Sequence, residues 1–455
     1  MDYHAQLKNK IDEKRAMIGV IGLGYVGLPL ALEMAKAGFQ TTGIDTDVVK
    51  VEMLNSGSSY IKDINTNDLK EAVKNAKLIG TTCKDSIMQL DVISICVPTP
   101  LNRDHQPDMS YINSAIDAIE TNFHKGILII LESTTYPGTT EELIEKRFEK
   151  MGYHAGEDYF LCFSPERIDP GNSIYTTKTT PKIIGGTTTR CLELGVQMYE
   201  SFVDEVVEVS SPRTAEMAKL LENTFRSINI AFINEISVLC EKLNLNVWEV
   251  IEAAKTKPFG FMPFYPGPGI GGHCIPLDPM YLQWTAKNHD AGSKFIELAQ
   301  ETNMYMPVHA VGKITEILNE ESKSLKNSNV LILGISYKQD ADDYRESPNI
   351  RIYQSLQDRG AKVSYFDSHV PFIKIKDERI ESIAELKNLE AYDCLVILTN
   401  HTNVNYRELL KFKVPIYDTR NAIKEKNELV YVLGDGSKNM NESFPDTMKS
   451  FLALN

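Results

Sequence analysis

A glycine-rich segment that ends in a cysteine carries the most specific chemical signal in the sequence. Residues 267–274 are GPGIGGHC, and Asp278 follows four residues after Cys274. Glycines let a backbone approach a ligand closely, and a cysteine presented there can be a nucleophile if a neighbour lowers its pKa or takes its proton. A buried cysteine in a tight turn is the alternative, because free cysteine often packs as a small apolar residue. Taken alone, the segment does not decide between them.

A lysine and an asparagine lie four residues apart in a long helical pattern that covers 212–243. Lys219 and Asn223 therefore share one face, where they could stabilise an oxyanion or relay a proton. A solvated surface is the alternative, although apolar Leu220 and Phe225 favour partial burial. A helix of ~30 residues spans roughly 45 Å, so we expect it to bridge two domains or to form a dimer interface.

A third candidate site follows an apolar strand as Ser-Pro-Glu-Arg at 164–167. Glu166 could act as a general base for water, and Arg167 could hold a polar substituent or a phosphate. A surface loop is the alternative.

A GxGxxG turn at 22–27 follows an apolar strand at 17–21 and opens a helix that closes at Gly38. The next strand ends in Asp45, which can accept hydrogen bonds from ribose hydroxyls and would repel a 2′-phosphate, so NAD is favoured over NADP. A turn without a ligand is the alternative. The residues expected to bind the cofactor here are Gly22, Gly24, Tyr25, Val26, Gly27 and Asp45.

Hydroxyl residues follow two further apolar runs, at 91–97 and 127–131. Ligands bind at the carboxyl ends of strands in open α/β sheets, so Thr99, Ser133 and Thr134 are expected to line the nicotinamide side. Capping of a helix N-terminus is the alternative for each of them.

The last third of the chain resembles the first, because apolar runs at 329–335, 362–367, 392–400 and 414–420 repeat the earlier order. We predict an α/β protein with two Rossmann-like, doubly wound domains joined by a long central helix. The expected boundaries are 1–205, 206–320 and 321–455. The C-terminal copy lacks GxGxxG and carries Lys338, Asp342, Asp343 and Arg345 at the equivalent turn, so we expect it to bind something other than a dinucleotide.

Composition limits the class of protein. The chain has 455 residues, of which 42% are hydrophobic and 24% charged, with a net charge of −14. This charge argues against a nucleic-acid surface, and no apolar run approaches the ~18 residues of a membrane span. The seven scattered cysteines and the polar N-terminus predict reduced thiols in the cytoplasm. Without CxxC or HExxH, we expect no metal site.

Together these motifs resemble the UDP-sugar 6-dehydrogenases, the family that includes UDP-glucose dehydrogenase. The similarity runs from Met17 to about Ile423, in the order GLGYVG, VPTP, STTYPGT, SPER, AKLLEN, GIGGHCIPLD, SYK…DDYRESP and YDTRN. Arg167 and His273 look most like the branch that acts on UDP-N-acetylhexosamines, because the UDP-glucose branch usually has phenylalanine and serine there.

The resemblance implies a four-electron oxidation of the sugar C6 alcohol by two NAD+, through a thiohemiacetal and a thioester on Cys274. Lys219, Asn223 and Asp278 correspond to residues around the oxyanion and the catalytic water, and Glu166 to an acid/base in thioester hydrolysis. The family often has a second glutamate where this chain has Pro170, so a role for that carboxylate is in doubt. Arg345 matches a residue near the cofactor. The residues that match substrate-binding positions are Glu166, Arg167, Lys219, Asn223, Tyr265, Gly267, Gly269, Gly271, Tyr337, Lys338 and Arg420.

The resemblance also implies a homodimer or a higher homo-oligomer, Arg420 reaching across a dimer, and a product used in surface polysaccharide synthesis. UDP-GlcNAc is the expected substrate, with UDP-ManNAc or UDP-GalNAc and then UDP-glucose as alternatives. A 3-hydroxyacid dehydrogenase would lack the cysteine loop and the second Rossmann-like domain. A catalytically silent sugar-nucleotide-binding protein would lose Cys274, Lys219 or Asp278, and all three are present.

Overall fold

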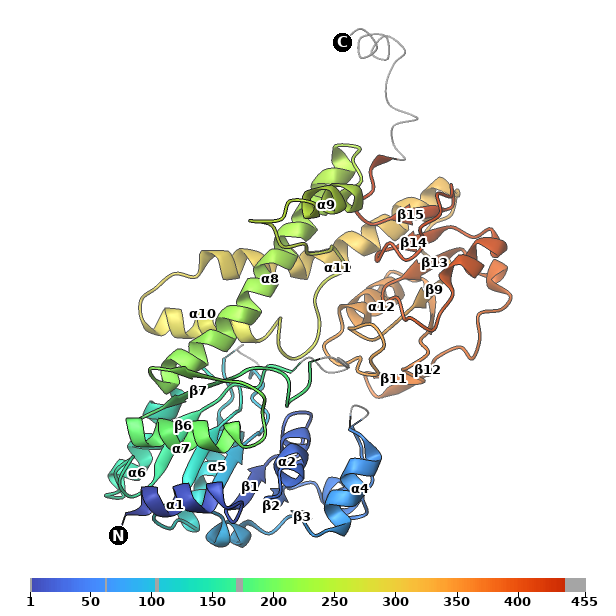
Figure 1. Cartoon of the computed structure of the whole chain (residues 1–455). Coiled ribbons are helices and arrows are strands. Elements are labelled where there is room, and N and C mark those ends of the chain that lie inside the picture. The colour runs from blue at the N-terminus through green and yellow to red at the C-terminus, as the bar shows by residue number, and fades with distance from the viewer. Residues whose placement is uncertain (1, 62–63, 103–105, 169–174, 438–455) are drawn as a thin grey trace. The chain divides into compact units, whose positions relative to one another are not determined.

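The computed structural model describes residues 2–61, 64–102, 106–168 and 175–437. The chain forms two compact units, shown in the ribbon of Figure 1. The first contains the residues up to Glu222 and Leu277–Gly292, and the second contains Asn223–Pro276 and the residues from Ser293 onward. The three-domain boundaries expected from the sequence stay a prediction, and Pro170 lies outside the described residues.

The first unit is built on a sheet whose central strands are buried on both faces. Its strands are β1 (Met17–Ile21), β2 (Gln40–Ile44), β3 (Leu78–Thr81), β4 (Val92–Ile95), β5 (Leu128–Leu131), β6 (Phe160–Phe163), β7 (Lys182–Gly186) and β8 (Val206–Val209). They are ordered β3-β2-β1-β4-β5-β6-β7-β8, and every neighbouring pair is parallel except β6 and β7. The first six strands have the order 3-2-1-4-5-6 of dinucleotide-binding sheets.

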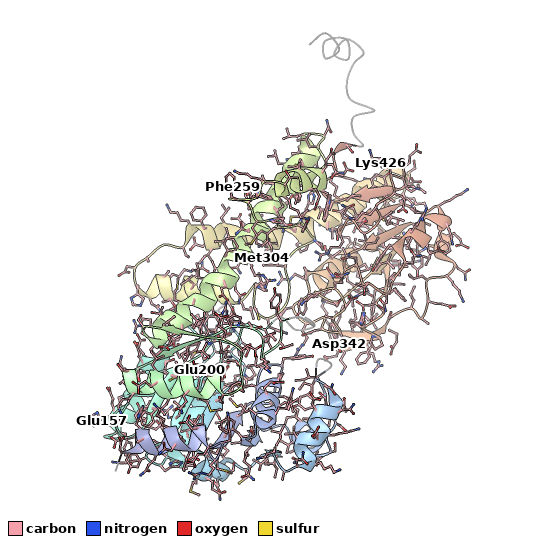
Figure 2. The ribbon with its side chains drawn as sticks, in the orientation of Figure 1. Glu157, Glu200, Phe259, Met304, Asp342 and Lys426 are labelled. Atoms are coloured by element: carbon pink, nitrogen blue, oxygen red, sulfur yellow. The ribbon has the colours of Figure 1, made fainter. Side chains whose placement is uncertain are left out.

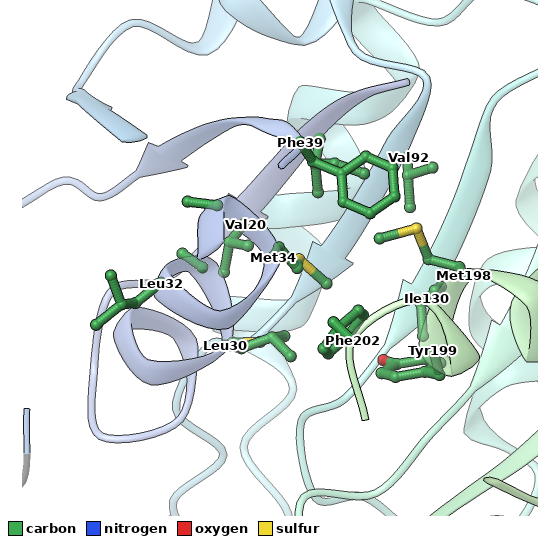
Figure 3. Packing of buried hydrophobic residues seen from close by; sticks show 14 of the residues in the cluster. Val20, Leu30, Leu32, Met34, Phe39, Val92, Ile130, Met198, Tyr199 and Phe202 are labelled. Atoms are coloured by element: carbon green, nitrogen blue, oxygen red, sulfur yellow. The ribbon is translucent and has the colours of Figure 1, made fainter. Parts of the chain in front are cut away.

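Alternating residues along the strands explain why the apolar runs are continuous. Leu128 and Ile130 of β5 belong to the core on one face, whereas Ile129 and Leu131 belong to the core on the other. Figure 3 shows the first of these cores, where Ile130 lies among side chains from neighbouring strands and helices. The helices of this unit are α1 (Tyr3–Asp12), α2 (Gly27–Lys36), α3 (Val48–Asn55), α4 (Thr66–Lys74), α5 (Ser110–Thr121), α6 (Lys146–Lys150), α7 (Thr189–Glu200) and α10 (Asp278–Asn288).

The second unit contains a smaller parallel sheet and an adjacent hairpin. Its strands are β9 (Asn329–Leu333), β10 (Lys362–Phe366), β11 (Phe372–Ile375), β12 (Glu378–Glu381), β13 (Cys394–Ile397), β14 (Ile416–Asp418) and β15 (Val430–Val432). The sheet order is β10-β9-β13-β14-β15, which is the 2-1-3-4-5 order of flavodoxin-like sheets. Its helices are α9 (Val247–Lys255), α11 (Lys294–Glu320) and α12 (Pro348–Asp358).

The long helix α8 runs from Pro212 to Lys242, a length of 31 residues, and contributes residues to both units. The predicted fold class, two Rossmann-like α/β domains with a long central helix, is confirmed. The sequence analysis did not identify strands β3, β7, β8, β11, β12 and β15. Among the described residues, no helix has both the length and the apolar character needed to cross a membrane.

Candidate active site

The first turn of the N-terminal sheet has the geometry that the GxGxxG pattern predicts. A Cβ on Gly27 would lie 1.8 Å from the carbonyl oxygen of Gly22, so the helix can approach the strand this closely only through glycine. A Cβ on Gly24 would meet open space, which leaves room for a phosphate beside the backbone. The residues present therefore fit a bound dinucleotide.

Asp45 stands at the end of β2 and touches this turn. Its Oδ2 accepts a hydrogen bond from the Leu23 N–H at 2.8 Å, and its Oδ1 accepts one from the Asp47 N–H at 2.9 Å. The ammonium of Lys50 lies 3.6 Å from Oδ2. A carboxylate offers about four acceptor positions, so Asp45 keeps capacity for ribose hydroxyls.

The residues expected on the nicotinamide side follow the neighbouring strands β4 and β5. Ser133 donates its hydroxyl to the Val97 carbonyl at 2.8 Å, so this hydroxyl ties the two strand ends together. The carbonyl of Thr99 accepts a hydrogen bond from the Tyr281 hydroxyl at 2.8 Å, which joins the end of β4 to α10. The structure thus brings Thr99 and Ser133 to one edge of the sheet.

Helix α8 holds the loop after β5 through two side chains. The ammonium of Lys219, which is largely buried, donates to the hydroxyl of Thr134. One turn earlier, the buried carboxylate of Glu216 accepts from the N–H groups of Gly138 and Thr140. Burial raises the pKa of Glu216 to about 7, against the opposing effect of these donors. Glu216 was not identified from the sequence, because no motif distinguishes it from the other polar residues of this helix.

Glu166 belongs to a buried group of charges that the sequence analysis also missed. The Lys182 ammonium lies 2.9 Å from Glu166 Oε2 and 2.6 Å from Glu132 Oε2. The hydroxyl of Tyr199 donates to the other oxygen of Glu132. A lysine that opens an otherwise apolar strand, Lys182-Ile-Ile-Gly-Gly, was the available sequence signal.

Arg167, next to Glu166, is paired with α8. Its Nε lies 3.1 Å from Glu222 Oε2, and a terminal nitrogen lies 2.8 Å from Glu222 Oε1. A further N–H donates to the Pro181 carbonyl at 2.9 Å. A guanidinium has five N–H donors, so two remain beyond these three contacts. The ion pair joins the 164–168 loop to α8 at Glu222, three residues after Lys219.

In the second unit, the glycine segment before the cysteine packs against the residues expected to bind substrate. A Cβ on Gly267 would lie 2.5 Å from a guanidinium nitrogen of Arg420, and one on Gly272 would lie 2.8 Å from the Tyr337 ring. The Gly267 N–H donates to the buried Asn234 side chain at 2.9 Å. Glycine is therefore required for this close packing, which brings the segment, Tyr337 and Arg420 together within one chain. Gly269 and Gly271 of the same segment pack against Pro348.

Cys274 follows as an exposed thiol that forms no disulfide. The preceding His273 places Nε2 3.5 Å from Asp343 Oδ2, and Arg345 makes two hydrogen bonds to the same carboxylate at 2.9 and 2.8 Å. Burial would raise the pKa of Asp343, but these partners outweigh it and lower the pKa. Arg345 is thus positioned in the second unit beside His273.

Two further predicted residues have separate surroundings. Lys338 follows Tyr337 in a turn where the buried Ser336 hydroxyl donates to the Lys338 carbonyl at 2.9 Å. Tyr265 donates to Glu252 of α9 at 2.7 Å and stacks on Trp248.

Asp278 is buried at the start of α10 in the first unit, whereas Asn223 and Cys274 belong to the second. The joint role expected for Cys274, Asp278, Lys219 and Asn223 therefore stays a prediction.

Asp340, His369 and His401 form a group whose potential ligand atoms lie within 4.8 Å of one another. His401 Nδ1 accepts the Asp340 N–H at 3.0 Å, and its Nε2 lies 3.1 Å from Asp367 Oδ2. Both ring nitrogens of His401 are therefore engaged by protein atoms, and a metal ion would have to displace one of these contacts.

Sequence profiles of one family match successive parts of the chain. The NAD-binding domain of the UDP-glucose/GDP-mannose dehydrogenase family matches residues 16–203, its central domain matches 213–305 and its UDP-binding domain matches 331–425.

A UDP-N-acetyl-D-mannosamine dehydrogenase from Pyrococcus horikoshii is 35% identical over 415 residues, covering 90% of this chain and 96% of that protein. An NDP-N-acetyl-D-galactosaminuronic acid dehydrogenase from Ralstonia nicotianae is 34% identical over 400 residues, covering 86% and 92%.

Solved structures of dehydrogenases with similar names resemble this chain in fold. The UDP-D-ManNAc dehydrogenase structure from Pyrococcus horikoshii superimposes with a TM-score of 0.85 at 34% identity, covering 92% of this chain and all of that one. A UDP-N-acetyl-mannosamine dehydrogenase from Staphylococcus aureus gives a TM-score of 0.80 at 33% identity, covering 93% and 100%. The chain belongs to the UDP-glucose/GDP-mannose dehydrogenase family. It is an NAD-dependent UDP-sugar dehydrogenase.

Proposed function

We propose that the chain oxidises the C6 alcohol of a UDP-N-acetylhexosamine to the uronic acid, with Cys274 as the covalent nucleophile. The observation that carries this proposal is the exposed thiol at the end of a glycine segment packed on Tyr337 and Arg420 of the UDP-binding domain. The thiol of Cys274 therefore comes directly after a segment that packs on residues of the UDP-binding domain, where a UDP-sugar could bind.

The residues of the first domain would hold NAD at the 22–27 turn and at Asp45. When bound, NAD+ accepts a hydride from C6, in two successive rounds. The Cys274 sulfur adds to the aldehyde carbon to form a thiohemiacetal, and oxidation of this adduct gives a thioester. Water then attacks the thioester carbon, the C–S bond breaks and the thiolate leaves. In sum, one alcohol, two NAD+ and one water give one carboxylate, two NADH and three protons.

Four other residues support these steps in the proposal. Lys219 and Asn223 donate hydrogen bonds to the oxygen that becomes anionic, and Asp278 orients the water. Glu166 accepts a proton from that water.

The acetamido group is the proposed determinant of substrate choice. Burying it without hydrogen bonds would cost about 1–3 kcal/mol. Arg167 supports its recognition because two guanidinium N–H groups remain beyond the contacts to Glu222 and Pro181. The loop at Tyr265–Gly269 would limit the available space. Several relatives carry the name UDP-N-acetyl-D-mannosamine dehydrogenase, which supports UDP-ManNAc over the UDP-GlcNAc first expected from the sequence.

A homodimer formed through the central helices is also part of the proposal. On α8, Phe225, Phe232 and Leu239 are spaced by seven residues and are 45%, 59% and 47% exposed. Phe259 and Met304, labelled in Figure 2, are further exposed apolar side chains of the second unit. Apolar residues at heptad spacing favour helix pairing. Light scattering of the purified protein would measure the mass, and a monomer at micromolar concentration would contradict this part.

We further propose that the protein works in the cytoplasm, because none of its seven cysteines forms a disulfide, and that its product is used in surface polysaccharide synthesis.

A coupled assay of NADH formation against UDP-ManNAc, UDP-GlcNAc, UDP-GalNAc and UDP-glucose tests the proposed reaction. We expect two NADH per sugar, no aldehyde captured by a hydrazine, and at least a ~10-fold preference in kcat/KM for an N-acetylated sugar. One NADH per sugar would contradict the covalent mechanism, and a preference for UDP-glucose would contradict the substrate class. An Arg167→Phe variant with unchanged preference would contradict the role of Arg167 alone.

A further inference from the structure

Glu166, the proposed base, belongs to a charged group whose other members, Lys182 and Glu132, have no part in the proposed reaction. The side chains of Lys182, Glu132 and Glu166 are 3%, 0% and 5% exposed, so all three are buried. Glu132 follows β5 directly and Glu166 lies shortly after β6, so both carboxylates reach the carboxyl edge of the sheet. Lys182 opens β7, which is antiparallel to β6 with Phe163 paired to Gly185. The same register places Lys182 opposite Glu166.

The hydrogen bonds of Glu166 occupy all but one of its acceptor positions. Its Oε1 accepts hydrogen bonds from the backbone N–H groups of Arg167 and Ile168 at 2.8 and 3.0 Å. Its Oε2 accepts a hydrogen bond from the Lys182 ammonium at 2.9 Å. A carboxylate has about four acceptor positions, so one position on Oε2 remains. Because both oxygens are held by hydrogen bonds, the direction of the remaining acceptor position is also fixed.

The group contains two carboxylates for one ammonium, and its surroundings determine which carboxylate keeps the charge. Tyr199 from α7 donates to Glu132, and the buried Cys96 thiol at the end of β4 also faces the group. Burial would raise the pKa of Glu166, but Lys182 and the two N–H donors outweigh it and lower the pKa. Burial raises the pKa of Glu132, and Lys182 offsets only part of this. The ionised form is therefore favoured more strongly at Glu166 than at Glu132.

A buried ion group of this kind is weak evidence for stability, because apolar side chains of similar volume often serve at least as well. Because the group includes Glu166, the base of the proposed reaction, it has a different role.

We propose that Lys182 is a positioning residue for Glu166, which it keeps ionised and aimed at the water that hydrolyses the thioester. This inference rests on the proposed function. In the step concerned, a water proton moves to the remaining position on Glu166 Oε2 while the water oxygen bonds to the thioester carbon. The C–S bond then breaks, and the electron pair stays on the Cys274 sulfur as thiolate. Glu132 accepts a second hydrogen bond from Lys182 and takes no part in this step.

Two single variants separate positioning from general support of the fold. Lys182→Met removes the cation from both carboxylates, whereas Glu132→Gln leaves the Lys182–Glu166 pair intact. Lys125→Met is the matched control, because Lys125 pairs with Asp158 in the same unit at 2.7 Å without contacting the group. Each variant is mixed with excess NAD+ and the preferred UDP-sugar, and NADH is followed from the first turnover. Melting temperatures establish that each variant is folded.

For Lys182→Met we expect a burst of two NADH per active site, then a steady rate at least ~10-fold below that of the wild type at neutral pH. Mass spectrometry of the quenched protein should find the thioester on Cys274. The acidic limb of the steady rate should move up by about one pH unit or more, because an unpaired buried carboxylate takes up a proton more readily. Glu132→Gln and Lys125→Met should stay within about 3-fold of the wild type, without a burst.

Equal losses in Lys182→Met and Glu132→Gln, or a folded Lys182→Met with an unmoved acidic limb, would overturn the inference. If Lys182→Met does not fold, the Glu132→Gln/Lys182→Met double variant, which removes one carboxyl group together with the ammonium, replaces it. That variant should show the same burst and the same shifted limb, and a wild-type profile would overturn the inference equally. A wild type that forms one NADH per sugar would refute the proposed function itself, whatever the variants do.

Discussion

The second strand of each Rossmann-like sheet is followed by an aspartate, and the two aspartates have different surroundings. Asp45 follows β2 and accepts N–H groups from Leu23 and Asp47, one on each oxygen. With about four acceptor positions on a carboxylate, about half of its capacity remains for a ligand. The first domain therefore keeps this side chain available for ribose hydroxyls.

Asp367 follows β10 at the equivalent place in the second sheet. Its oxygens accept four N–H groups, from Ile335, Ser336, His369 and Val370, at 2.7–3.1 Å. The Nε2 of His401 also lies 3.1 Å from Oδ2. All acceptor positions of Asp367 are thus occupied by the protein itself.

The comparison shows that topology places the aspartate and the local turn decides its use. In the first domain the carboxylate meets one N–H of a glycine turn. In the second domain it holds a turn without GxGxxG, together with the loop that carries His369. A dinucleotide ribose would find no acceptor at Asp367, which is consistent with the UDP-binding domain assigned to residues 331–425.

Replacing Cys274 should separate ligand binding by the two domains from the chemistry. For Cys274→Ala we expect carboxylate formation to fall by ~10³-fold or more, because no covalent intermediate can form. Calorimetry should find UDP-sugar and NAD+ affinities within about 10-fold of the wild type. Cys274→Ser should retain a slow, ester-forming reaction. Wild-type NADH production by the alanine variant would refute the role of the thiol.

Replacing Asp367 should destabilise the second unit without affecting the cofactor. An Asp367→Asn change places an amide N–H₂ against backbone N–H donors in a buried site, at a cost of about 2–4 kcal/mol in the free energy of unfolding. Denaturant unfolding measures this cost, and titration measures the NAD+ affinity of the folded protein. A weakened NAD+ affinity with unchanged stability would reverse the comparison.

Replacing Asp45 should have the opposite pattern. Asp45→Asn keeps an acceptor for the Leu23 N–H but loses the charge and part of the ribose contact. We expect kcat/KM for NAD+ to fall ~10-fold, about 1.4 kcal/mol, and the ratio of NADP+ to NAD+ efficiency to rise. The free energy of unfolding should change by less than about 1 kcal/mol. Equal efficiencies with both cofactors in the wild type would show that Asp45 does not select NAD.

Local patterns predicted most of this framework. Continuous apolar runs identified β1, β2, β4, β5, β9, β10, β13 and β14, most of which are buried on both faces. The glycine spacing identified the turn before Asp45. The different use of Asp45 and Asp367 could not be predicted, since both are aspartates after apolar strands and only the folded turns determine which donors they meet. The Lys182 pairs depend on the antiparallel register of β7, which is set by residues far apart in sequence.

The smallest effect concerns pH, where the two domains should respond in opposite directions. Burial would raise the pKa of Asp367, but His401 and the backbone donors lower it, so its contribution to stability is present above the unfolded pKa and is lost as pH falls. Burial raises the pKa of Glu216, in the first unit, to about 7 from the model-compound value of 4.5. A raised pKa contributes stability that is complete below the unfolded value and lost as pH rises through the folded value.

Glu216→Gln should remove this second dependence while keeping an acceptor for the Gly138 and Thr140 N–H groups. Between about pH 6 and about pH 8, the wild type should lose about 1 kcal/mol of unfolding free energy through Glu216, and the variant should not. The stability difference between variant and wild type should therefore favour the variant more at the higher pH. Denaturant unfolding at both pH values measures this difference. Glu142→Gln is a suitable control, because that carboxylate is more exposed and pairs with Arg213 at 3.2 Å near the same loop. Parallel pH profiles for Glu216→Gln and the wild type would show that Glu216 does not titrate in this range, and that α8 holds the 133–140 loop with a permanently charged carboxylate.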